Sequence, residues 1–159
     1  MKNLLLVCAC IFLITAVFSQ NKVNLMPDSM ICYVGQLTRP EFEKLTGSET
    51  GVGKDGEVFY LVRNTYDEEV TVLRCLYRQA DQKLGSVEFS TPRYFNYWLA
   101  FSYLEGYEGE RDCKARKNRK GEITRVDLCH SGLKCRISGV RRLNPQLTMA
   151  VVTYKAVGL

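Results

Sequence analysis

The chain has 159 residues, 46% of them hydrophobic, and a formal net charge of +5 at pH 7. This length fits a single domain with a substantial core, because domains of about 100 to 150 residues are the commonest size. So mild a charge does not by itself indicate a nucleic-acid-binding protein, and we expect no nucleic-acid partner.

The first nineteen residues, MKNLLLVCACIFLITAVFS, predict a secretory signal peptide. One lysine precedes a long apolar run, and Val17 and Ser19 suit cleavage by signal peptidase. The apolar run is shorter than the roughly 20 residues that a membrane-spanning helix needs. Cleavage after Ser19 removes Lys2, so 21 of the 22 basic residues remain against 17 acidic ones, a net charge of +4. We therefore expect a secreted protein without a membrane span.

The mature chain keeps five cysteines, and in an oxidising secretory route they are expected to form disulfides. These residues are Cys32, Cys75, Cys113, Cys129 and Cys135. The pairing does not follow from the sequence, and because the number is odd, one thiol is free or pairs with another chain. The segment CHSGLKC, with His130 beside Cys129, offers too few ligands in a secreted chain for a metal site to be expected, and no cofactor is expected.

Residues 20–56 are expected to form an N-terminal segment with one short helix. The stretch before Gly35 has no clear periodicity, and Pro27 argues against regular structure there. In TRPEFEKLTG, Thr38 can cap a helix and Glu41 stands where a capping box needs it. The glycine-rich run GSETGVGKDG that follows predicts a flexible loop.

Residues 57–159 are expected to form eight short strands. The predicted strands are Glu57–Tyr66, Val70–Gln79, Leu84–Ser90, a segment that begins at Arg93, Tyr107–Arg116, Glu122–Leu128, Leu133–Ser138 and Leu147–Ala156. The fourth, RYFNYWLAFSYLEGYE, is the most aromatic. Alternation places Phe95, Tyr97, Leu99, Phe101 and Tyr103 on one side of it. A helix is the alternative, but the aromatic content and the following Gly106 favour a strand.

Eight consecutive strands without intervening helices predict a mainly β fold, an eight-stranded antiparallel up-and-down barrel. Closure removes the exposed edges that a sheet of this size otherwise leaves. A barrel of eight strands has room for one small ligand. A sandwich of two sheets is the alternative that a strand count does not exclude.

The stretches FYLVRNTYD, from Phe59, and LRCLYRQ, from Leu73, resemble the opening of the lipocalins of tick saliva, the family that includes histamine-binding proteins. In that family a short helix closes the barrel floor and a cysteine lies on the second strand. The resemblance in motif extends from Thr38 to Gln79. It implies a lipocalin-like barrel that evades host immunity by sequestering a small host mediator, either a biogenic amine such as histamine or a lipid. Because the chain ends at Leu159, just after the eighth expected strand, it resembles a C-terminally shortened member.

The expected ligand site is the barrel lumen. An amine would be held by a buried carboxylate beside aromatic rings. The candidate carboxylates are Glu57, Glu88, Glu105 and Asp127. If the aromatic series that starts at Phe95 lines the lumen, an apolar lipid mediator fits better than an amine. The predicted ligand-binding residues are Tyr60, Tyr77, Glu88, Tyr97, Trp98, Phe101 and Tyr103, with Val151 as a further lining residue.

Other functions are also open at this stage. One alternative is a secreted inhibitor of a host defence protein that acts through loop or surface contacts. The basic run from Arg111 to Arg125 could bind heparin-like polyanions or a membrane surface. An enzyme is not expected, because the chain has a single histidine and no nucleophile or phosphate-binding motif. A hydrolase would need clustered carboxylates in a cleft.

Overall fold

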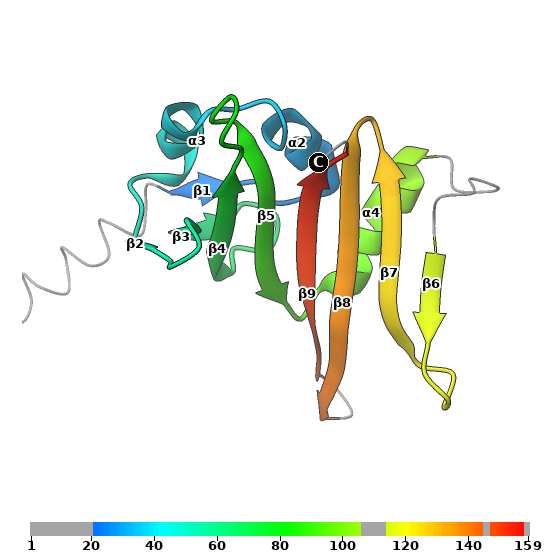
Figure 1. Ribbon diagram of the computed structural model, residues 1–159. Helices are drawn as coiled ribbons and strands as arrows, with labels where there is room; N and C mark the ends of the chain where they lie inside the picture. The colour runs from blue at the N-terminus through cyan, green and yellow to red at the C-terminus, as the bar shows by residue number, and fades with distance from the viewer. Residues whose placement is uncertain (1–20, 106–113, 145–146, 158–159) are drawn as a thin grey trace, which may run out of the picture.

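The computed structural model describes residues 21–105, 114–144 and 147–157, which form one mainly β unit (Figure 1). The mainly β prediction is confirmed. In chain order the elements are β1 (Lys22–Val23), α2 (Pro27–Tyr33), α3 (Arg39–Thr46), β2 (Gly51–Val52), β3 (Val58–Asn64), β4 (Val70–Tyr77), β5 (Leu84–Thr91), α4 (Tyr94–Glu105), β6 (Lys114–Lys117), β7 (Ile123–His130), β8 (Leu133–Asn144) and β9 (Leu147–Ala156). The predicted signal peptide lies outside the described residues.

The strands form a single sheet in the order β1-β3-β4-β5-β9-β8-β7-β6, with β2 paired to the side of β3. Neighbouring strands are antiparallel except β1 and β3, which are parallel. The described sheet is open, with β1 and β6 at opposite ends of the order, so the predicted closed barrel is not observed (Figure 1). Helix α4 follows β5, and the chain returns at the far edge of the sheet with β6. The last strand, β9, therefore takes the place beside β5.

The prediction of a strand after Arg93 is wrong, because residues 94–105 form α4. Tyr97 is fully buried, and Tyr94 and Trp98 are partly buried against the core, so the covered positions have the i, i+3, i+4 spacing of a helix. Phe95 and Leu99, one turn apart, are 46% and 47% exposed. A strand would have placed Phe95, Tyr97 and Leu99 on the same side. The sequence contains the helical spacing as well, but its aromatic content favours a strand.

The N-terminal segment contains two helices rather than one. Helix α3 has the predicted capping box, in which the Glu41 carboxylate accepts bonds from the Thr38 backbone N–H and hydroxyl at 2.8 and 2.7 Å. Helix α2 corrects the expectation that the stretch before Gly35 lacks regular structure because of Pro27. Pro27 occupies the first turn, where its missing N–H needs no partner. The expected flexible loop after Gly47 includes β2, which pairs with β3.

One face of the sheet, here called the inner face, packs against the helices. Alternate residues of β3, β4, β5, β7, β8 and β9 are buried there, and α4 lies behind β7, β8 and β9 in the view of Figure 1. The side chains of this face include Tyr60, Leu73, Cys75, Val87, Phe89, Val126, Leu128, Cys135, Ile137, Val152 and Tyr154. Phe42 of α3 meets Tyr60 edge to face at 5.7 Å, and Tyr97 of α4 meets Phe89 at 5.5 Å. The inner face is thus a packed core.

Three of the five cysteines expected in disulfides are unpaired in the structure. Cys32, Cys75 and Cys135 are free thiols. The strand registers place Cys75, Val87, Tyr154 and Cys135 in one row across four strands, so three strand spacings, about 14 Å, separate the two buried thiols. A disulfide requires Cα atoms within about 7 Å. Cys129 lies on the outer face, away from Cys135, and Cys113 lies outside the described residues.

Asn64 connects the first residues of the described chain to α4. Its side-chain oxygen accepts bonds from the backbone N–H groups of Leu25 and Tyr66 at 3.3 and 3.2 Å. Its side-chain nitrogen donates to the Tyr97 hydroxyl at 2.8 Å. The Tyr154 hydroxyl donates to the carbonyl of Leu25 at 3.0 Å. These bonds satisfy buried polar groups between the helices and the sheet. None of the described helices is long and apolar enough to span a membrane.

Candidate functional site on the outer face of the sheet

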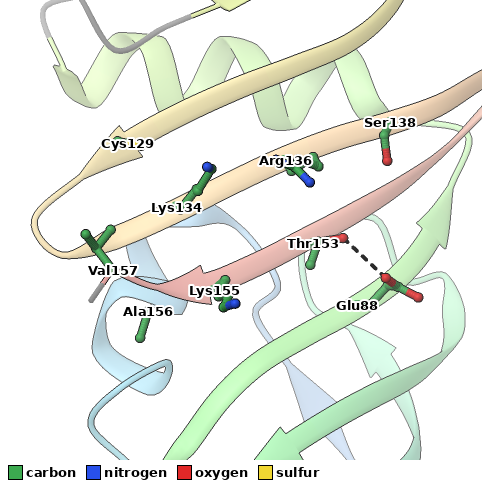
Figure 2. A pocket seen from close by; sticks show the side chains of 9 residues that line it. All are labelled: Glu88, Cys129, Lys134, Arg136, Ser138, Thr153, Lys155, Ala156 and Val157. Atoms are coloured by element: carbon green, nitrogen blue, oxygen red, sulfur yellow. Dashed lines mark hydrogen bonds between the residues drawn. The ribbon is translucent and has the colours of Figure 1, made fainter. Parts of the chain in front are cut away.

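A groove of about 560 Å³ runs over the opposite, outer face of β5, β9, β8 and β7. This volume lies in the range of pockets that hold small molecules. The lining side chains belong to Glu88, Cys129, Lys134, Arg136, Ser138, Thr153, Lys155, Ala156 and Val157. Figure 2 shows that most of them follow β8 and β9, two residues apart along each strand. Because side chains alternate between the two faces of a strand, the lining residues of β8 and β9 at this spacing face away from the core, whereas the side chain of Ala156 belongs to the buried inner face.

Lys134 and Lys155 occupy directly opposed positions on β8 and β9. Like charges at such a cross-strand position destabilise a sheet. The row that contains them continues through Ser86 on β5 and Cys129 on β7, neither of which has a carboxylate. Among the described residues, no acidic group lies within 4 Å of either lysine. The two ammonium groups therefore form a focus of uncompensated positive charge.

Asp127 on β7 is fully occupied by two arginines beside the groove. Arg125 donates to one carboxylate oxygen at 2.6 Å and Arg136 to the other at 2.7 Å. Partial burial opposes ionisation of Asp127, but the two arginine bonds outweigh it and lower its pKa below the usual value. Asp127 therefore stays charged, and it neutralises part of the arginine charge without compensating either lysine.

Glu88 on β5 is the one carboxylate that lines the groove. It accepts a bond from Arg74 at 3.3 Å and one from the Thr153 hydroxyl at 3.4 Å, the contact drawn in Figure 2. Arg74 is held in turn by Glu57 at 2.6 Å, and this bond lowers the pKa of the Glu57 carboxyl. The Glu88 carboxylate thus already has an ion-pair partner, Arg74, which lies outside the groove.

The charges of the groove indicate an anionic ligand. Three cations and one carboxylate line it, and the carboxylate and Arg136 already have partners. Lys134 and Lys155 together can donate to a carboxylate, sulfate or phosphate group. Val157 adds apolar surface at one end, where it is 58% exposed. An organic anion with a short apolar part matches both features.

Three of the predicted tyrosine ligands, Tyr60, Tyr77 and Tyr97, lie between the inner face and the helices, where their hydroxyl groups already have partners. Tyr60 and Tyr97 are fully buried. The Tyr60 hydroxyl donates to Glu43 at 3.1 Å and contacts the Tyr77 hydroxyl at 2.9 Å. The Tyr97 hydroxyl accepts a bond from Asn64. These three tyrosines join the helices to the sheet and line no part of the groove.

The other predicted site residues are scattered. Glu88 lies in the groove. Trp98 packs on Phe95 of α4, with ring centroids 5.1 Å apart. Val151 lies on the outer face, opposite to Tyr60, so the two cannot line one cavity. The side chains of Phe101, Tyr103 and Glu105 lie outside the described residues.

The sequence reasoning missed Lys134 and Lys155. The segment LKCRIS alternates apolar and polar residues, and so does VTYKA, from Val152. Each pattern could have placed its lysine on the solvent-facing side. The register that brings the two lysines together is set by the β8–β9 pairing and does not follow from the pattern.

Comparisons of the chain with protein-family models, with curated proteins and with solved structures gave no match. In the part of the chain that the structure describes, no three His, Cys, Asp or Glu side chains gather into a metal-binding group. The functional argument therefore depends on the groove itself.

Proposed function

We propose that this is a secreted, non-catalytic binding protein that holds a small organic anion in the groove on the outer face of the sheet. The ligand carries a carboxylate or similar acidic group for Lys134 and Lys155 and an apolar part for Val157. The observation that carries the proposal is the opposition of the two lysines without a carboxylate partner. The expected sequestration of a small mediator is kept, but the site moves from a barrel lumen to the outer face.

The charge of the groove favours a lipid mediator with an acidic group over a biogenic amine, the two mediator classes expected from the sequence. A biogenic amine is a cation and would have to enter a groove whose unpaired charges are positive. An acidic lipid mediator gains charge-assisted hydrogen bonds, each worth about 1.5–3 kcal/mol. The anionic lipid class is therefore favoured over histamine.

Calorimetric titration with octanoate and octylamine tests this proposal, because the two ligands share one alkyl chain and differ in charge. Octanoate is expected to bind, and octylamine and histamine are not. The double variant Lys134→Gln/Lys155→Gln should weaken octanoate binding by about tenfold or more. The control Lys44→Gln/Lys54→Gln removes the same charge from exposed positions outside the groove and should leave the affinity unchanged. Binding of octylamine in place of octanoate would contradict the proposal.

A second candidate, inhibition of another protein through surface contacts, has one observation in its favour. Val70, Val72 and Leu76 project from β4 with exposed fractions of 47%, 51% and 40%. Neighbouring exposed apolar side chains mark surfaces that bind proteins. The same titration distinguishes the candidates, since an inhibitor of this kind needs no small ligand in the groove.

A further inference from the structure

The β6–β7 hairpin carries a second positively charged surface. Its four cations are Arg116, Lys117, Arg119 and Lys120, here called the basic hairpin. All four side chains are exposed. Strand β6 is the last strand of the described sheet, so this hairpin forms one end of the molecule's β surface (Figure 1).

Asn118 fixes the shape of the hairpin turn. Its side-chain oxygen accepts bonds from the backbone N–H groups of Lys120 and Glu122 at 2.9 and 3.0 Å. Its own N–H donates to the carbonyl of Glu122 at 2.9 Å, and Gly121 supplies the positive φ of 78° that the turn needs. The cations on either side of Asn118 therefore project from an ordered turn.

The acidic groups near the basic hairpin are already bonded elsewhere. Glu122 accepts a bond from the side-chain nitrogen of Asn118 at 2.8 Å. Asp127 is held by Arg125 and Arg136. Arg116 lies directly opposite Arg125 across β6 and β7, a second like-charge pair on the outer face. Within the described part of the chain, none of the four cations has an ion-pair partner.

The composition of the turn favours a sulfated polymer over a membrane or a single-stranded nucleic acid. Residues 114–122, KARKNRKGE, contain no aromatic side chain and no apolar one larger than alanine. Interfacial membrane binding relies on apolar and aromatic side chains that enter the lipid. Single-stranded nucleic acids are bound by aromatic side chains that stack on the bases. A chain of sulfate groups needs only spaced cations.

The basic hairpin is separate from the groove. Arg116 and Lys155 lie three strand spacings apart across the sheet and four residues apart along it, about 20 Å on the diagonal. An anion of the size of octanoate cannot bridge that distance. A small anion held by the groove lysines therefore does not contact the basic hairpin.

We propose that the basic hairpin binds a linear sulfated polysaccharide. The sulfate groups bind Arg116, Lys117, Arg119 and Lys120 along the ordered turn, and the binding is driven by charge. Release of counterions from the polymer makes the affinity depend steeply on salt, as it does for other linear polyanions. This inference does not rest on the proposed function of the groove.

The test is surface plasmon resonance of the purified protein on an immobilised heparin oligosaccharide, measured over a series of salt concentrations. Lys117→Gln/Lys120→Gln is compared with the matched control Lys44→Gln/Lys54→Gln. The hairpin variant is expected to bind about tenfold or more weakly, and the slope of log affinity against log salt falls by about one for each lost contact. The control variant binds like the unaltered protein. Octanoate binding in the groove is the same in all three proteins.

Three results would overturn the proposal. The first is equal weakening in the hairpin and control variants, which would make the effect one of net charge alone. The second is equal binding to a desulfated oligosaccharide of the same length. The third is binding to vesicles of phosphatidylserine and phosphatidylcholine with no binding to heparin.

Discussion

Lys134 on β8 lies directly opposite Lys155 on β9, and no acidic group among the described residues lies within 4 Å of either lysine. Such an arrangement costs stability, which supports the proposed ligand-binding role over a structural one. Replacement of Lys155 by threonine should raise the free energy of unfolding by about 0.2–1 kcal/mol. The same change should weaken octanoate binding, because one of the two donors is lost. Urea denaturation and calorimetry of this variant measure the two effects.

A matched replacement elsewhere provides the control for that experiment. Lys54→Thr removes a lysine from the exposed loop before β3 and should change neither the free energy of unfolding nor the affinity for octanoate. A loss of stability in Lys155→Thr would show that the lysine supports the fold, and the argument from repulsion would then fail.

The exposure pattern of α4 predicts that substitutions at Phe95, Tyr97 and Leu99 lower the free energy of unfolding by unequal amounts. If the segment were a strand, the three losses would be similar. Leu99→Ser should lower the free energy of unfolding by about 0.5 kcal/mol, because the side chain is about half exposed. Phe95→Ser should lower it by about 0.5–1.5 kcal/mol, because the half-exposed ring also loses its contact with Trp98. Tyr97→Ser should cost about 3–5 kcal/mol, since it empties a fully buried site. Chemical denaturation measures all three. Equal losses at the three positions would instead indicate a strand with one buried side.

The hydrogen bond between Asn64 and Tyr97 predicts that a single hydroxyl matters to stability. Tyr97→Phe leaves the buried side-chain nitrogen of Asn64 without its acceptor and should lower the free energy of unfolding by about 1–3 kcal/mol. Tyr66→Phe removes a hydroxyl from a residue that is 53% exposed and should have almost no effect. Thermal unfolding of the two variants under the same conditions measures this difference in stability. Similar melting temperatures for both variants would count against the bond.

Tyr60 predicts a loss of stability at alkaline pH. Burial raises the pKa of its phenol to about 12, above the ordinary value of 10, although the bond to Tyr77 acts in the opposite direction. Since the folded-state pKa is the higher one, the stabilisation is complete below pH 10 and is lost as the pH rises from 10 to about 12. Denaturant unfolding over this range should show the decline, and Tyr60→Phe should make it shallower. An identical pH dependence in the variant would contradict this assignment.

The strands before and after α4 were largely predictable because their apolar residues alternate. The segments of β3 and β9 each bury every second side chain, and this pattern is local. The capping box of α3 is local as well. Helix α4 was not predicted because its aromatic side chains fit both the period of a strand and the period of a helix. Only the burial of Tyr97 without Phe95 distinguishes the helix from the strand.

The groove could not be predicted because it depends on contacts that are distant in the chain. Glu88 and Thr153 are 65 residues apart, and they meet because β9 pairs with β5. That pairing follows from the position of α4 between β5 and β6. The expectation of strands in sequential order therefore placed the aromatic residues around a lumen and left the lysines of β8 and β9 without a role.

The most direct test of the binding site is an NMR titration of the lysine side chains with octanoate. The ε-methylene signals of Lys134 and Lys155 are expected to shift together and to saturate at the affinity found by calorimetry. Those of Lys44 and Lys54 should remain unchanged. Shifts confined to the core aromatic signals of Tyr60 and Tyr97, with both groove lysines unaffected, would place the ligand on the inner face and contradict the account.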